Sequence, residues 1–123
     1  MVDASAVVDL LVNGSPLPQR AAMAPVHLDA EVLSALGRLH RDGTLTAFDV
    51  EEMLDDLATL AVVRVPIEQL TVMAFALRHS VALRDGLYVA LAQLSNASLK
   101  TTDARLARTC ADQQLCALVV PGT

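Results

Sequence analysis

The chain has 123 residues, of which 54% are hydrophobic and 19% charged, a composition that excludes a disordered acidic chain and predicts one domain over residues 1–123. Fourteen acidic against nine basic residues give a net charge of −5, which excludes nucleic-acid binding through a broad positive surface. No apolar run approaches the ~18 residues of a membrane helix, and no basic segment typical of a signal peptide opens the chain, so we expect a cytoplasmic protein without membrane association.

The first half of the chain predicts strands and helices in alternation. Two apolar residues form a very short strand before Asp3, and Ser5 is expected to cap the helix that follows. Thr46 is expected to cap a later helix, and Gly43 ends the one before it. From apolar spacing, the predicted segments are a strand at 1–2, a helix at 6–12, a strand at 21–26, helices at 28–41 and 47–60, and a strand at 62–65.

The second half continues the alternation. A helix at 67–79 precedes a helix at 86–94 that is apolar nearly all round, which is typical of a helix buried in a domain or an interface. Asp85 and Asp103 open the helices that follow them. The remaining predicted segments are a strand at 98–101, a helix at 103–113 and a strand at 118–120. Such short apolar strands between helices indicate an α/β sandwich with a mostly parallel, two-sided sheet.

Four acidic residues stand where the active site of such a sheet would lie, beyond the carboxyl ends of the strands. They are Asp3, Glu31, Asp85 and Asp103. Taken singly, Asp85 and Asp103 are explained as helix caps and Glu31 as a partner of a helix dipole. Asp3 is harder to explain, because Ser5 already supplies a cap and an acid beside an apolar strand needs a cation or several donors.

Taken together, the four acids predict a metal site. Neighbouring carboxylates repel one another unless a cation lies among them. Oxygen ligands without His or Cys suit Mg²⁺ or Mn²⁺. Such an ion can activate water towards a phosphorus atom and stabilise charge on the phosphoryl oxygens. The sequence therefore favours metal-dependent phosphodiester hydrolysis.

The motifs around these acids resemble those of PIN-domain ribonucleases of the VapC type, the toxins of VapBC toxin–antitoxin pairs. The resemblance covers almost the whole chain, and its motifs stand at 2–6 (VDASA), 29–36 (DAEVLSAL), 84–92 (RDGLYVALA) and 101–107 (TTDARLA). It implies a PIN-like three-layer α/β/α sandwich. It also implies an endoribonuclease that uses Mg²⁺ or Mn²⁺ held by the four acids, with Thr102 orienting ligands or water. The partners implied are a VapB-type antitoxin, an RNA substrate and a second copy of the chain.

The sequence departs from the family pattern in three places. Only two residues precede Asp3, so we expect a shortened first strand or a natural start further upstream. The segment 13–20 is shorter than in the family pattern, so we expect the helix that usually shapes the cleft there to be trimmed. Gly86 stands where relatives commonly carry Ala, and we expect it to weaken the helix start by under ~1 kcal/mol.

Other polar residues are predicted to lie on the surface or to be structural. Arg84 is expected in a surface ion pair, and Tyr88 in the core. The group with surface or structural roles comprises Arg38, Arg41, Arg78, His27, His40 and His79. Cys110 and Cys116 are expected to be free thiols, as suits a reducing cytosol.

Two alternatives to a ribonuclease remain. The first is a catalytically inactive PIN-like binding module that acts through protein or RNA partners. The second is a receiver-like domain with Asp3 as phosphate acceptor, which the sequence disfavours because no acceptor Asp ends a strand in mid-chain.

Overall fold

The computed structural model describes residues 1–14 and 22–119. Within these ranges the helices and strands are α1 (Ala4–Asn13), β1 (Ala22–Pro25), α2 (Leu28–Arg41), α3 (Ala47–Thr59), β2 (Val62–Val65), α4 (Thr71–Ala76), α5 (Leu83–Ser95) and α6 (Ala104–Asp112). The predicted positions of β1, α2, α3, β2 and α6 are confirmed to within a residue or two. Most of the segment 13–20, residue 21 of the predicted strand 21–26 and residue 120 of the predicted strand 118–120 lie outside the described residues.

The sheet is parallel and short. β1 and β2 pair in register, with Ala22 opposite Val62 and Pro25 opposite Val65. Backbone hydrogen bonds extend the pair into a row of segments in the order 62–65, 22–25, 1–3, 99–100 and 117–119. The predicted strands at 1–2, 98–101 and 118–120 are thus reduced to isolated parallel bridges. They are short because the chain turns at once into α1 after Asp3 and towards α6 after Lys100.

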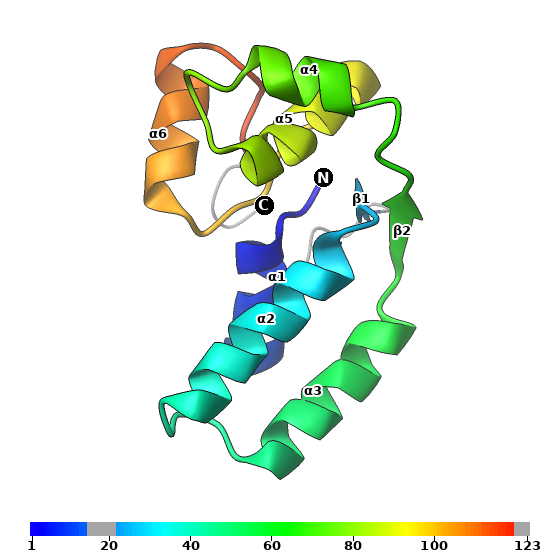
Figure 1. Cartoon of the computed structure of the whole chain (residues 1–123), viewed down its shortest axis with the longest axis vertical. Coiled ribbons are helices and arrows are strands. Elements are labelled where there is room, and N and C mark those ends of the chain that lie inside the picture. The colour runs from blue at the N-terminus through cyan, green and yellow to red at the C-terminus, as the bar shows by residue number, and fades with distance from the viewer. Residues whose placement is uncertain (15–21, 120–123) are drawn as a thin grey trace.

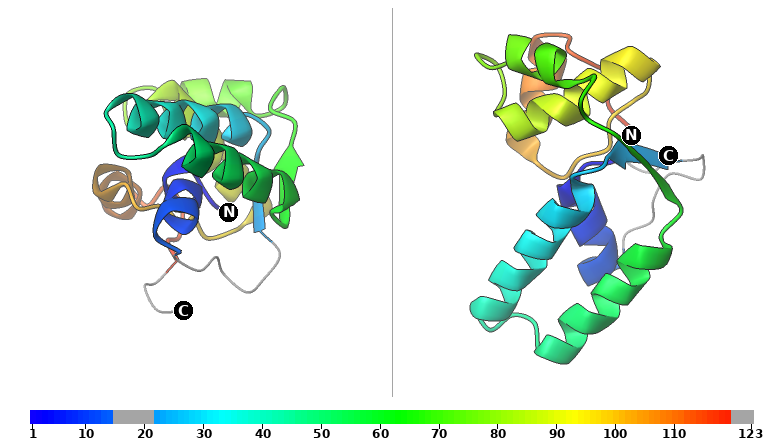
Figure 2. Two further views of the ribbon diagram at one scale, coloured as in Figure 1. Left: turned by 90° about the horizontal axis from the view of Figure 1, so that it is seen from below. Right: turned by 45° about the vertical axis from the view of Figure 1, so that its right-hand side comes forward.

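Helices cover the sheet on both sides. Figure 1 and the right-hand view of Figure 2 show the strand segments between one group of helices, α1–α3, and a second group, α4–α6. This arrangement is the predicted α/β/α sandwich. The N-terminal segment lies at its centre, and the chain turns from there into α1 where the two groups of helices meet (Figure 1).

Helix ends correct two predictions. Asp3, not Ser5, caps α1, because its carboxylate accepts the backbone N–H of Ala6 at 3.0 Å. The cap that Thr46 was expected to form on α3 is confirmed, as a capping box with Asp49. Asp85 is no cap: α5 begins earlier, at Leu83, which places Asp85 in its first turn.

The helix predicted at 67–79 is shorter than its apolar pattern. α4 spans only Thr71–Ala76 and has no side-chain cap at its start. Leu70 N–H donates to Ile67 at 2.8 Å and Ser80 N–H to Leu77 at 2.9 Å, so tight turns flank the helix on both sides. The apolar periodicity is real, because Leu70 and Ala74 are buried. The turns that flank α4 bury the apolar residues of this pattern just as a longer helix would.

The core is aliphatic and centres on α5. The buried residues of α5 are Gly86, Tyr88, Val89, Ala90, Leu91 and Ala92. Gly86 lies so close to α4 that a Cβ on it would stand 3.0 Å from the carbonyl oxygen of Ala74. The glycine therefore permits the close packing of α4 on α5, a role that the expected weakening of the helix start does not include.

Two further features follow from the described residues. Cys110 is buried and Cys116 half-buried, and both are free thiols, as predicted. Across the described ranges, none of the helices combines the length and the apolar character needed to cross a bilayer.

Candidate active site

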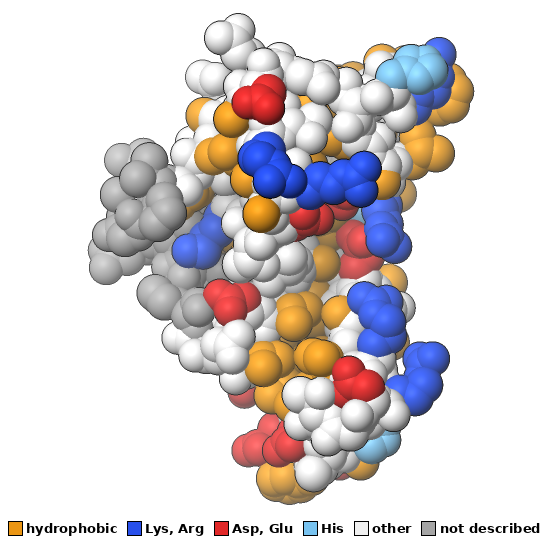
Figure 3. All heavy atoms as spheres, turned by 90° about the vertical axis from the view of Figure 1, so that its left-hand side faces the viewer, with side chains coloured by type: hydrophobic (Ala, Val, Ile, Leu, Met, Phe, Trp, Pro, Cys, Tyr) orange, Lys and Arg blue, Asp and Glu red, His pale blue; other side chains and the backbone are white. Residues whose placement is uncertain are grey.

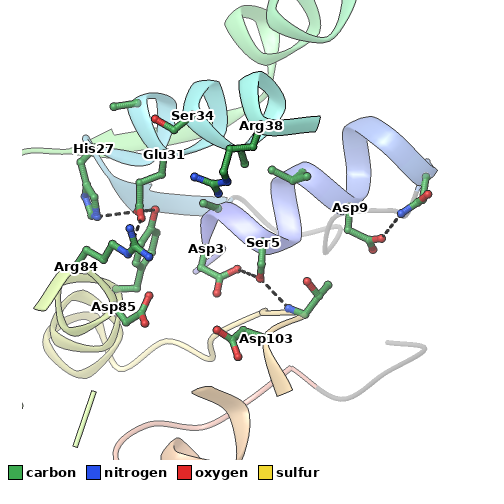
Figure 4. A pocket seen from close by; sticks show the side chains of 17 residues that line it. Asp3, Ser5, Asp9, His27, Glu31, Ser34, Arg38, Arg84, Asp85 and Asp103 are labelled. Atoms are coloured by element: carbon green, nitrogen blue, oxygen red, sulfur yellow. Dashed lines mark hydrogen bonds and ion pairs between the residues drawn. The ribbon is translucent and has the colours of Figure 1, made fainter. Parts of the chain in front are cut away.

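The five predicted site residues line one cavity. It has a volume of about 770 Å³ and lies between α1, α2, the start of α5 and the turn before α6. Its lining includes Asp3, Glu31, Asp85, Thr102 and Asp103. Figure 4 shows the side chains of the four acids entering from separate segments. Figure 3 shows acidic side chains with Lys and Arg side chains on several sides of them. Long-range folding thus brings together residues up to a hundred positions apart.

Asp3 is the buried acid of the site, with only 5% of its surface exposed. Its Oδ1 accepts the Ser5 hydroxyl at 2.6 Å and the Ala6 N–H at 3.0 Å. Burial raises the pKa of Asp3 and outweighs these hydrogen bonds, and the charge of Asp103 raises it further. The folded chain therefore holds a carboxyl group whose charged form is costly, which a cation would offset.

Ser5 joins the first acidic segment to the last. Besides donating to Asp3, its hydroxyl accepts the backbone N–H of Thr102 at 2.9 Å and lies 3.1 Å from the Thr101 hydroxyl. The hydrogen bond between Thr102 and Ser5 spans 97 positions of the chain. Ser5 therefore holds Thr102 and its neighbour Asp103 against the start of α1, which is a different role from the cap predicted for it.

Asp103 is both a cap and a wall of the cavity. Its Oδ1 accepts the N–H groups of Arg105 and Leu106 at 3.0 and 3.2 Å, which starts α6. The cap explanation that the sequence allows is therefore correct, and it does not exclude a part in the site. One carboxylate oxygen makes both bonds, so the other oxygen has no partner among the described residues.

Glu31 is held by three side chains. The Tyr88 hydroxyl donates to Oε1 at 2.7 Å, His27 Nε2 lies 3.0 Å from the same oxygen, and Arg84 Nε lies 3.7 Å from Oε2. Burial raises the pKa of Glu31, but the contacts with His27 and Tyr88 and the charges of His27 and Arg84 outweigh it, so the net pKa is lowered. Glu31 therefore favours the charged form.

The buried Tyr88 and the half-buried His27 support Glu31 from behind. Their rings lie 4.9 Å apart at the centroids, and Tyr88 is 1% exposed. Burial and the bond to Glu31 raise the pKa of Tyr88, which keeps its hydroxyl a donor. The His27 nitrogens are buried without a hydrogen bond in the described part of the chain; Nε2 has only its close approach to Glu31.

The pKa of Asp85 is affected by the charges of all three other acids. It is half-buried, and burial raises its pKa. Arg84 lowers the pKa, whereas the charges of Asp103, Glu31 and Asp3 raise it. The four carboxylates therefore lie close enough to repel one another, and a divalent cation among them would relieve that repulsion.

The acids share the cavity but are not gathered into one ligand group. Within the described ranges, no three His, Cys, Asp or Glu side chains lie close enough to hold a metal. Asp3 is turned to Ser5, Glu31 to Tyr88 and Asp103 to the amides of α6. The donor chemistry fits Mg²⁺ or Mn²⁺, because all the acids are hard oxygen ligands. Ligation requires their side chains to turn.

Sequence reasoning missed three members of the site. The sequence predicts Ser5 as a cap, His27 as surface or structural and Tyr88 as a core residue. The pattern Asp-x-Ser and the spacing of His27 to Glu31, one helical turn, are the signals that could have indicated the first two. Tyr88 meets Glu31 across 57 positions, so no local pattern reveals the contact.

Arginine side chains surround the acids. Arg84 forms its predicted carboxylate pair, with Glu31, and remains 73% exposed at the cavity. Arg38 also lines the cavity, on α2. These residues supply local positive charge in a chain whose net charge is −5. An anionic ligand would meet cations at the entrance before it reaches the acids.

Comparison with known proteins shows similarity to one domain family and to several ribonucleases. The PIN domain family matches residues 1–112. The chain is 45% identical to Ribonuclease VapC3 of Mycobacterium tuberculosis over 116 residues, which cover 88% of this chain and 85% of the relative. It is 35% identical to Ribonuclease VapC9 of the same organism over 113 residues, covering 89% of each. Ribonuclease VapC12, from the same organism, is 31% identical over 115 residues, covering 88% and 89%.

Proposed function

The chain belongs to the PIN-domain family, and on that premise we propose that it is a metal-dependent endoribonuclease, the toxin of a VapBC-type toxin–antitoxin pair. The observation that carries the proposal is the convergence of Asp3, Glu31, Asp85 and Asp103 on one cavity from four separate segments. The ribonuclease names of relatives at 31–45% identity support it.

The four acids would hold Mg²⁺ or Mn²⁺. When bound, the ion supplies positive charge to the phosphoryl oxygens and makes water more acidic. Asp3 would contribute a carboxylate, whose Oδ1 accepts the Ser5 hydroxyl and the Ala6 N–H in the metal-free chain. Tyr88 and His27 fix Oε1 of Glu31, while Oε2 faces the more exposed Arg84.

Thr102 and the arginines would act on the RNA side of the cavity. Thr102 is exposed at the cavity wall, and its backbone N–H donates to Ser5; these observations support a role in which its hydroxyl would orient water or a phosphate. Arg84 and Arg38 would bind phosphates beside the bond that is cut. The proposed products carry a 5′-phosphate and a 3′-hydroxyl.

The proposed partners follow from the same family. A VapB-type antitoxin would bind the chain and suppress cleavage, and the protein would act in the cytoplasm, where its RNA substrate is found. We also propose a homodimer. The support for it is apolar side chains on the outer surface of α4 and at the start of α5: Val72 is 82% exposed, and Phe75 and Leu83 are each 55% exposed.

The second candidate function is an inactive binding module. The observation that favours it is the absence of a ready three-ligand group within the described residues. Titration calorimetry with Mn²⁺ separates the candidates. Binding that disappears in Asp85→Asn supports the enzyme, whereas no carboxylate-dependent binding supports the module.

The test of activity is end mapping of total cellular RNA incubated with antitoxin-free protein and Mg²⁺ or Mn²⁺. We expect a few new RNA ends with the wild type and at least a ~100-fold loss with Asp85→Asn, because the variant removes a ligand charge. The matched control is Asp55→Asn, an exposed acid of α3 outside the cavity, which should cleave like the wild type. Equal cleavage by Asp85→Asn would contradict the proposal.

A further inference from the structure

A second cavity adjoins the candidate active site at Asp85 and Asp103. It has a volume of about 390 Å³ and shares Asp85 and Asp103 with the first cavity. Its other lining residues come from the segment between α4 and α5 and from the first turns of α6, and they include Arg78 and Arg105. The two shared acids therefore stand between two hollows, and each hollow has two arginines in its lining.

Arg78 is held in place but keeps most of its donors. Its guanidinium carbon lies 4.4 Å above the centre of the Phe75 ring, and Nη1 donates to the Phe75 carbonyl at 3.1 Å. A guanidinium has five N–H donors, so the remaining ones stay available. Stacking on an aromatic face limits the freedom of the side chain, which reduces the entropy lost when it binds an anion.

Neither arginine of the second cavity is neutralised by a carboxylate. In the described part of the chain, the ion pairs of arginine are Arg64 with Asp29 and Arg84 with Glu31. Arg64 is held by two bonds to Asp29, at 2.9 and 3.2 Å, which is typical of a structural pair. Arg78 and Arg105 are both exposed and form no such pair. Their charges are thus available to an outside ligand.

We infer that the second cavity is a subsite for single-stranded RNA, in which Arg78 and Arg105 bind backbone phosphates on one side of the bond to be cut. The inference rests on the proposed ribonuclease function. A polyanion lying across Asp85 and Asp103 must carry its neighbouring phosphates away from those acids on both sides. Arg38 and Arg84 receive one side, and Arg78 and Arg105 the other. Nonspecific affinity for single strands rests on such backbone contacts.

The first experiment measures binding without cleavage. Fluorescence anisotropy with a labelled oligouridylate in EDTA gives the dissociation constant at several salt concentrations, for Arg78→Gln, Arg105→Gln and the double variant. Each lost phosphate contact should weaken binding by about fivefold and reduce the salt slope by ~0.7. Arg108→Gln is the matched control, because Arg108 is an exposed arginine of α6 that lines neither cavity.

The second experiment measures cleavage of the RNA found by end mapping. We expect KM to rise about fivefold in each variant while kcat stays within twofold, because the arginines bind strand outside the reacting atoms. If the arginine variants left both the salt slope and KM unchanged, the subsite inference would be wrong, while the proposed ribonuclease function would be unaffected. Absence of wild-type cleavage would overturn the ribonuclease, while the binding slopes would still decide the subsite.

Discussion

At the scale of single residues, Asp3 combines a structural and a chemical role. Its carboxylate caps α1 and at the same time lines the cavity. The cap satisfies an orphan N–H of the helix, and burial makes the negative charge costly. The other three acids line the same cavity, and the charge of Asp103 adds to this cost. A residue that is unfavourable for the metal-free protein is thus favourable for binding a cation.

We expect Asp3→Asn to stabilise the metal-free protein at neutral pH. An asparagine oxygen can accept the same Ser5 and Ala6 bonds without a charge. The pKa of Asp3 is raised above 3.8, so the folded chain keeps a proton that the unfolded chain has lost. Wild-type stability therefore falls, relative to the variant, as the pH rises from about 4 through the folded pKa. The free energy of unfolding of the variant should therefore exceed that of the wild type at pH 7, and the difference should shrink towards pH 4.

Urea unfolding in EDTA between pH 4 and pH 7 measures this difference. If the wild type gained stability over Asp3→Asn as the pH rises, the argument from burial would be wrong. Repeating the measurement with Mn²⁺ should narrow or reverse the difference, because an ion that binds only the folded wild type stabilises it.

At the scale of elements, the contact between α4 and α5 depends on one missing side chain. Gly86 lets the backbone of α4 approach so closely that a Cβ would stand 3.0 Å from Ala74 O and 3.3 Å from Ala74 Cα. This contact matters for function, because α5 carries Asp85 and Tyr88 into the cavity. Gly37, within α2, has no atom within 4 Å of the place where its Cβ would be.

The two glycines should therefore respond differently to alanine. Gly37→Ala should raise the free energy of unfolding by about 0.5–1 kcal/mol, because alanine favours helix and limits the unfolded chain. Gly86→Ala should give no gain, since its methyl group meets a carbonyl and the packing of α4 must shift. Chemical unfolding of both variants tests the comparison. Equal stabilisation of both would show that α4 yields without cost.

At the scale of the whole molecule, charge and apolar surface are distributed unevenly. The net charge is −5, yet arginines gather around the acidic cavities, so attraction of RNA is local. On the outer surface of α4, Val72 and Phe75 lie on one face of the helix, three residues apart, and are largely exposed. Exposed apolar groups that cluster in this way are typical of an interface.

We expect Val72→Glu to convert the proposed homodimer into monomers. The valine is 82% exposed, so a charge there costs the isolated chain little, whereas burying that charge in an interface costs several kcal/mol (about 3). Sedimentation velocity measures the change. Phe48→Glu, at an exposed position of α3 in the other layer, is the control that should remain dimeric. A Val72→Glu variant that stays dimeric would place the interface elsewhere.

The sequence by itself determined the order of the elements and the candidate acids. Apolar spacing located α2, α3, β2 and α6, since helix and strand periods are local properties of the chain. Positions at the ends of elements and the family motifs indicated the four acids, Asp3, Glu31, Asp85 and Asp103. A capping side chain such as Thr46 was predictable for the same local reason, because its partner lies three residues away.

The tertiary structure alone decided how these acids are held and what surrounds them. Tyr88 reaches Glu31 across 57 positions, and Ser5 reaches Thr102 across 97. The close approach at Gly86 and the second cavity beside Asp85 likewise arise where separate elements pack. A contact between distant segments depends on how the helices lie over the sheet, and that arrangement is set by burial of the whole core rather than by any local pattern.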